Sequence, residues 1–135
     1  MNIFEVIKRG DINALKANEY QIIQNVNDII ETNDTERDNY ITYWMASHKD
    51  PEISLLMFEV FMNTCKTAFK PEKYEEVMKL YTHPTMIAAV AWENIHILDV
   101  IKDYLDKDNL KVEMYAEYGD ICSLKLMRWY NKNFS

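Results

Sequence analysis

The side chains best suited to chemistry in this chain are three histidines and two cysteines. His48, His83 and His96 are too widely spaced for a His-Glu-x-x-His zinc site or another close metal-ligand pattern. Cys65 and Cys122 form no Cys-x-x-Cys pair, and a nucleophilic cysteine needs a histidine beside it. Both cysteines lie in apolar stretches that predict helices, so we expect reduced, buried and inert thiols.

Other kinds of reactive site have little support in the sequence. The chain contains only 2 glycines, so it has no glycine-rich loop that could hold a phosphate. Its 22 acidic residues leave a carboxylate pair for acid–base work open, but no pair stands out by spacing. We therefore expect no enzyme activity, no cofactor and no metal.

The composition indicates one helical domain spanning residues 1–135. Hydrophobic residues make up 48% of the 135 residues, and few glycines and prolines favour helices joined by Asn and Asp turns over a β-protein. The net charge of −7 disfavours binding to nucleic acid phosphates. No apolar run approaches the roughly 18–20 residues that span a bilayer, and early charges argue against a secretory signal. A cytoplasmic location is the expectation.

Four chain breaks organise the predicted helices. Apolar residues at steps of three and four flank each break, which predicts a helix, a tight turn and a second helix. The longest such stretch, Pro84–Leu105, predicts two short helices with small residues on the first so that the second can approach closely. The four breaks are Gly10-Asp11, Asp50-Pro51, Glu93-Asn94 and Gly119-Asp120.

Three other segments complete the prediction. Residues 21–39 are rich in Asn, Asp and Thr and predict a loop with a short helix near 27–31. Pro71–Tyr81 predicts a separate, inserted amphipathic helix. The final helix is expected to bury a stripe formed by Ile121, Leu124, Met127 and Tyr130.

Aligned on the breaks, the segments ASHKDPEISLLMF, AVAWENIHILDVI and AEYGDICSLKLM resemble the ankyrin repeat. The Thr-Pro-Leu-His signature is absent, and Lys49 and Glu93 replace the glycine of the break in two units. The resemblance implies an all-α solenoid of about four stacked ankyrin-like helix pairs, with the inserted helix added. A helical array of another type, or an irregular bundle, is the alternative.

The ankyrin resemblance implies a binding face on the exposed side of each first helix. Trp44, Trp92, Met114 and Tyr118 give this face an aromatic and apolar character, which is typical of interface hot spots, although a shift of these side chains into the core stays open. The expected partner-binding residues are Trp44, His48, Trp92, Met114, Glu117 and Tyr118. The full set of slots expected to be exposed is Glu5, Lys8, Arg9, Trp44, Ser47, His48, Ala88, Ala91, Trp92, Met114, Glu117 and Tyr118.

Two functions follow as hypotheses. The first is noncatalytic binding of another protein through this face, and the second is an acidic inhibitor or decoy that occupies the basic nucleic-acid site of another protein. The second rests on acidic clusters, which are otherwise ordinary solvated surface. A homodimer through the apolar N-terminal helix pair is a further open alternative. The acidic clusters are Glu31, Asp34, Glu36 and Asp38; Glu72, Glu75 and Glu76; and Asp99, Asp103, Asp106 and Asp108.

Overall fold

A computed structural model describes residues 2–119 and 123–134, and all regular secondary structure in these two ranges is helical. The all-α prediction is therefore confirmed. The elements are α1 (Ile3–Arg9), α2 (Ile12–Ala17), α3 (Glu19–Thr32), η1 (Arg37–Asn39), α4 (Ile41–Ala46), α5 (Pro51–Ala68), α6 (Pro71–Ala91), α7 (Ile95–Ile101), η2 (Lys102–Tyr104), α8 (Lys107–Tyr118) and α9 (Leu124–Phe134).

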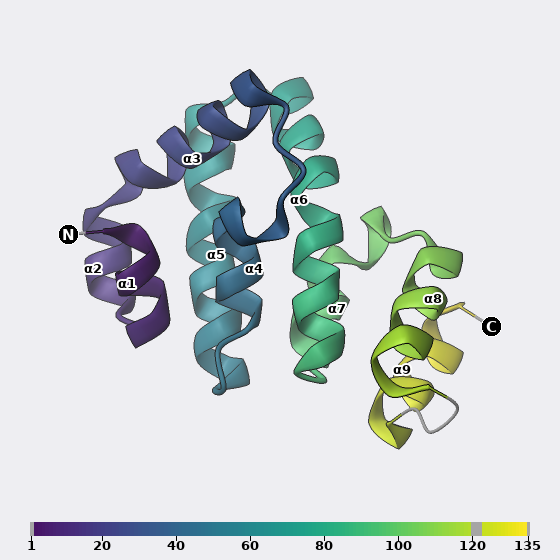
Figure 1. Cartoon of the computed structure of the whole chain (residues 1–135). Coiled ribbons are helices and arrows are strands. Elements are labelled where there is room, and N and C mark those ends of the chain that lie inside the picture. The colour runs from purple at the N-terminus through teal and green to yellow at the C-terminus, as the bar shows by residue number, and fades with distance from the viewer. Residues whose placement is uncertain (1, 120–122, 135) are drawn as a thin grey trace.

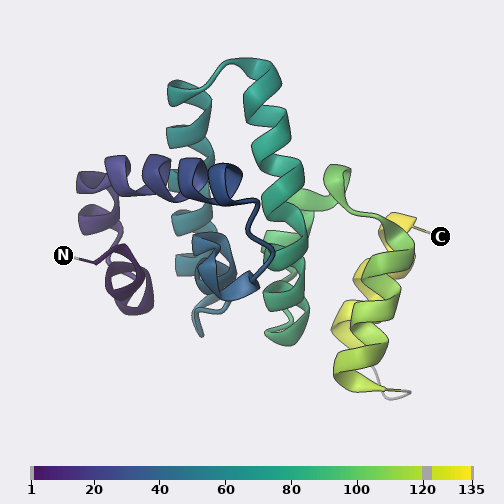
Figure 2. The same ribbon diagram turned by 45° about the horizontal axis from the view of Figure 1, so that its top comes forward.

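The helices form a row of antiparallel pairs that runs from the N-terminal end to the C-terminal end (Figure 1). The first helix of each pair contacts the first helix of the next, in the order α1, α4, α6 and α8. The second helices α2, α5 and α7 contact one another in the same order. Helix α3 stands outside this pairing and runs across α5, as the turned view shows (Figure 2).

The predicted turns lie where the sequence places them, because each is defined by local capping chemistry. Asp11, Asp50 and Asn94 are N-caps whose side chains accept backbone N–H hydrogen bonds from the first turn of α2, α5 and α7. Gly10 ends α1 in the left-handed conformation. Glu93 takes the same role in its turn with φ 52°, although it is not a glycine. At the fourth break, Asp120 lies outside the described residues.

The loop predicted over residues 21–39, with its short helix near 27–31, is wrong for residues 21–32, which all belong to the 14-residue helix α3. Ile22, Val26 and Ile29 recur at helical spacing and are all buried, and this spacing was the signal within the polar sequence. Asn25 anchors the helix, since its Nδ2 donates to the Asn39 carbonyl and its Oδ1 accepts from the Tyr81 hydroxyl at 2.7 Å. Tertiary contacts thus outweigh the low helix propensity of Asn and Asp.

The inserted helix and the first helix of the third pair are one continuous helix, α6, which corrects the predicted separation at Pro84. Proline removes one backbone donor inside the helix. Threonine hydroxyls on either side bind back to the preceding turn, from Thr82 to the Met78 carbonyl and from Thr85 to the Tyr81 carbonyl, both at 2.6 Å. Thr85 also lies 2.7 Å from the Thr42 hydroxyl, which ties buried parts of α6 and α4 together.

The last helix buries a different face from the one predicted. Leu124 and Met127 are exposed and Tyr130 is half-buried, whereas Leu126 and Trp129 face the core; Ile121 lies outside the described residues. Both stripes have helical spacing, so periodicity alone does not choose between them. The choice comes from packing on α7, where the Trp129 indole donates to an Asp99 carboxylate oxygen at 2.6 Å.

The core between α5 and α6 contains Cys65, as the sequence predicts; Cys122 lies outside the described residues. Burial raises the pKa of the Cys65 thiol from its ordinary value of 9.0 to about 12. The folded chain keeps this proton at pH values where the unfolded chain loses it. The contribution of Cys65 to stability is therefore complete below about pH 9 and is lost as the pH rises towards about 12.

In a Cys122→Ser variant, we expect iodoacetamide at pH 8 to alkylate native Cys65 at least about 100-fold more slowly than the urea-unfolded chain, because only an accessible thiolate reacts. Mass spectrometry of quenched time points measures both rates. Equal rates in the native and unfolded chains would show that Cys65 is not enclosed. Circular dichroism before and after reaction controls for unfolding by the label.

Candidate functional site

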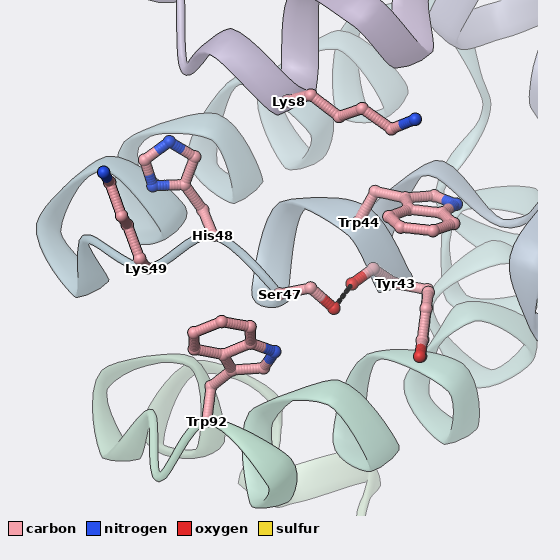
Figure 3. Close-up of a pocket in the computed structure, with 7 residues that line it drawn as sticks. All are labelled: Lys8, Tyr43, Trp44, Ser47, His48, Lys49 and Trp92. Carbon is pink, nitrogen blue, oxygen red and sulfur yellow. Dashed lines mark hydrogen bonds between the residues drawn. The ribbon is translucent and has the colours of Figure 1, made fainter.

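The turn ends of the first three helix pairs surround a hollow of about 480 Å³, which we name the tryptophan hollow. Trp44 and Trp92 lie on opposite sides of it, and basic side chains close the remaining edge (Figure 3). The lining residues are Lys8 from α1, Tyr43 and Trp44 from α4, Ser47, His48 and Lys49 from the turn after α4, and Trp92 after α6. The stacking of α1, α4 and α6 therefore assembles the site from three units.

Three contacts hold the Trp44 ring in place. Its indole N–H donates to the Asp38 carbonyl at 2.9 Å, which turns the ring out of the short helix α4. The Lys8 ammonium lies over the ring, 5.2 Å from its centroid, at cation–π distance. Tyr43 packs edge-on against the same ring, with centroids 5.3 Å apart. Trp44 is thus a fixed, half-buried wall of the hollow.

His48 has a defined tautomer and a defined position. Its Nδ1 accepts a hydrogen bond from the Asp50 backbone N–H at 3.0 Å, so the remaining ring proton is on Nε2. Gly10 gives the imidazole room, because a Cβ at that position would lie 2.8 Å from His48 Nε2. The turn at Gly10 therefore shapes the turn at His48, and His48 Nε2 faces Gly10.

Trp92 follows the last residue of α6 and is 53% exposed, the largest exposed ring of the hollow. Its backbone is fixed from α8, where the Tyr118 hydroxyl lies 2.8 Å from the Val90 carbonyl and 3.1 Å from the Ala91 carbonyl. These carbonyls belong to the last turn of α6, which lacks internal helical donors. Tyr118 therefore supports the site from behind and does not line it.

The structure brings together three of the six expected partner-binding residues, Trp44, His48 and Trp92. Met114 is wrong as an exposed residue, because α8 turns it towards α6 and leaves it 4% exposed. Ala88 is also buried, since close packing of α4 on α6 covers it. Glu117 is exposed on α8 but does not line the hollow. Of the other expected slots, Lys8 and Ser47 line the hollow, while Glu5, Arg9 and Ala91 are exposed outside it.

Replacing Tyr118 with phenylalanine is expected to lower the free energy of unfolding by about 1 kcal/mol, since the last turn of α6 loses a hydroxyl donor. The comparison variant is Tyr115→Phe, because Tyr115 is 62% exposed on the same helix and should change stability little. Urea unfolding monitored by circular dichroism measures both. Equal effects would show that the Tyr118 hydroxyl contributes nothing specific.

Tyr43 and Lys49 also line the hollow and were not among the predicted slots, although each is adjacent to one. His83 and His96 are exposed on other elements and do not join His48. Within residues 2–119 and 123–134, no group of three His, Cys, Asp or Glu side chains is close enough to hold a metal ion. In the same residues, no helix has the length and apolar character to cross a membrane. The hollow thus offers aromatic faces and N–H donors.

The described part of the chain is thus an all-helical array with a hollow lined by aromatic and basic side chains. The chain belongs to a family of unknown function, DUF5903, whose model matches residues 2–131. The match covers nearly all of the described helices and assigns no activity, and no ankyrin-repeat family was detected. Comparisons with curated proteins and with solved structures returned no match.

Proposed function

We propose that the chain is a noncatalytic protein-binding module and that the tryptophan hollow is the centre of its binding surface. The observation that carries this proposal is the exposed Trp92 ring opposite the fixed Trp44 ring (Figure 3). Large aromatic side chains held in place beforehand desolvate much area at small entropic cost, as interface hot spots do.

The arrangement of the helix pairs supports an ankyrin-like solenoid as the architecture of this module. First helices stack on first helices and second helices on second helices, and Asx caps begin α2, α5 and α7. In such an array each pair contributes a few side chains to one continuous surface. Lys8, Trp44 and Trp92 come from three successive pairs in this way.

The proposal is tested by capturing a partner with the tagged full chain, identifying it by mass spectrometry, and measuring its affinity as a purified protein. Trp92→Ala is expected to weaken binding roughly 30-fold or more, as loss of a hot-spot residue does. Tyr20→Ala is the matched control, because Tyr20 is 64% exposed on α3 outside the hollow. A partner that binds both variants equally would exclude the hollow as the binding centre.

The acidic decoy is the second candidate function. It is favoured by Glu31, Glu36 and Asp38, which are exposed near the α3–α4 connection. A decoy predicts a basic partner, steep loss of affinity with salt, and sensitivity to these acids more than to Trp92. The same purified partner, measured at low and high salt, therefore distinguishes the two functions.

A further inference from the structure

The tryptophan hollow differs in charge from the chain around it. The chain carries a net charge of −7, yet none of its described Asp or Glu residues lines the hollow, whereas Lys8 and Lys49 do. In the part of the chain that the structure describes, the ion pair within 4.0 Å is Arg37–Asp38 alone. Among residues 2–119 and 123–134, neither lysine ammonium group of the hollow therefore has a carboxylate partner within 4.0 Å, and the two lysines come from separate elements.

A neutral donor adds to these two charges. The indole N–H of Trp92 has no protein partner among residues 2–119 and 123–134, unlike that of Trp44, which donates to Asp38. The hollow thus collects donors and cations but few free acceptors. Such a lining is complementary to an anion.

The aromatic walls restrict the anion to one attached to an apolar group. Trp44 and Trp92 face each other across a volume of about 480 Å³, which accommodates a ring or branched side chain as well as a charge. A long polyanion such as nucleic acid is disfavoured, since its phosphates beyond the hollow would meet the negatively charged remainder of the chain. A single carboxylate beside an aromatic side chain satisfies both conditions.

We propose that the tryptophan hollow binds an acidic segment of the partner protein, with an aspartate or glutamate carboxylate on the edge that carries Lys8 and Lys49 and a neighbouring aromatic or aliphatic side chain between Trp44 and Trp92. This inference rests on the proposed protein-binding function and adds the chemistry of the segment that is bound. The charges select the carboxylate, and the indoles supply the apolar contact.

A second basic groove, between α7 and α9, serves as an internal comparison. It is lined by Lys102, Lys125, Arg128 and Lys132, but Asp99 lines it as well and accepts from the indole of Trp129. The indole N–H resonances of the chain's three tryptophans therefore monitor the two sites separately. Trp44 and Trp92 monitor the hollow, and Trp129 monitors the groove.

The test is a titration of the full ¹⁵N-labelled chain with phenylacetate and with its uncharged analogue phenylacetamide, followed by the indole N–H resonances. We expect saturable shifts of Trp92 at millimolar phenylacetate, and binding of the amide that is about fivefold weaker, in the range of one or two exposed charge pairs. Equal affinity for both compounds would overturn the inference. So would shifts confined to Trp129.

Charge variants supply the control. The Lys8→Gln/Lys49→Gln double variant should bind phenylacetate no more tightly than phenylacetamide. The Lys16→Gln/Lys79→Gln variant removes two exposed lysines outside the hollow and should keep the wild-type preference. If both double variants lose the preference equally, the effect is one of net charge and the inference is wrong.

Partner binding separates this inference from the proposed function. If Trp92→Ala no longer binds the captured partner but Lys8→Gln/Lys49→Gln still does, the protein-binding function stands and the proposed binding of a partner carboxylate is wrong. In the other case, phenylacetate binds as expected while the captured partner binds Trp92→Ala and the wild-type chain equally. The hollow is then a site for aromatic acids, and both the proposed function and the acidic segment are wrong.

Discussion

Replacing Phe61 with alanine is expected to lower the free energy of unfolding by about 3–5 kcal/mol, the range for truncation of a buried phenylalanine. Phe61 is fully buried on α5, and its ring lies 5.8 Å from that of Phe58 and 4.9 Å from that of Tyr81 on α6. The substitution leaves a cavity between the two longest helices. Part of the loss comes from the aromatic contacts, which the smaller side chain cannot make.

Two comparison variants sharpen this measurement by urea unfolding. Leu56→Ala removes a side chain of the same helix that is 47% exposed, and it should change the free energy of unfolding much less. Phe61→Leu retains most of the volume and should cost about 1–1.5 kcal/mol. A Phe61→Ala cost as small as that of Leu56→Ala would contradict the packing of α5 against α6.

The second large effect is expected at Gly10, where alanine should lower the free energy of unfolding by about 2–3 kcal/mol through strain and overpacking. The residue has φ 69°, which disfavours a side chain. An added Cβ would also lie 2.8 Å from both His48 Nε2 and Ile53 Cγ2. The methyl group therefore has to displace the second turn, which carries one edge of the tryptophan hollow.

A double-mutant cycle with His48→Ala separates the contact with His48 from the rest of the cost. Removing the imidazole should recover part of the Gly10→Ala cost, so the double variant is more stable than the sum of the single effects predicts. Additive effects would show that the steric contact with His48 carries no energy and that backbone strain and the contact with Ile53 account for the loss. The indole N–H resonance of Trp44 reports any accompanying change in the hollow.

Half of the expected binding residues were predictable because their positions depend on local structure repeated in each unit. Trp44, His48 and Trp92 lie at the ends of the first helices or in the turns after them, and these turns are visible in the sequence from the Asx caps that follow. Met114 failed for a nonlocal reason. The helical spacing of α8 is compatible with more than one buried face, and contact with α6 chooses the face that covers Met114.

The sequence by itself determined the all-helical class, the three turns at Asp11, Asp50 and Asn94, and the burial of Cys65. Caps, glycine conformations and apolar runs act over a few residues, so they can be recognised without knowing the neighbours. Each of these features survives unchanged in the folded chain.

Only the tertiary structure decided that α3 is a helix, that α6 continues through Pro84, and that α9 buries Trp129. The polar sequence of α3 gains its stability from burial on α5 and from Asn25, whose amide binds Asn39 and Tyr81. The position of Trp129 depends on Asp99, 30 residues away in sequence. Such contacts join distant segments, and their energy exceeds the local propensities on which a reading of the sequence relies.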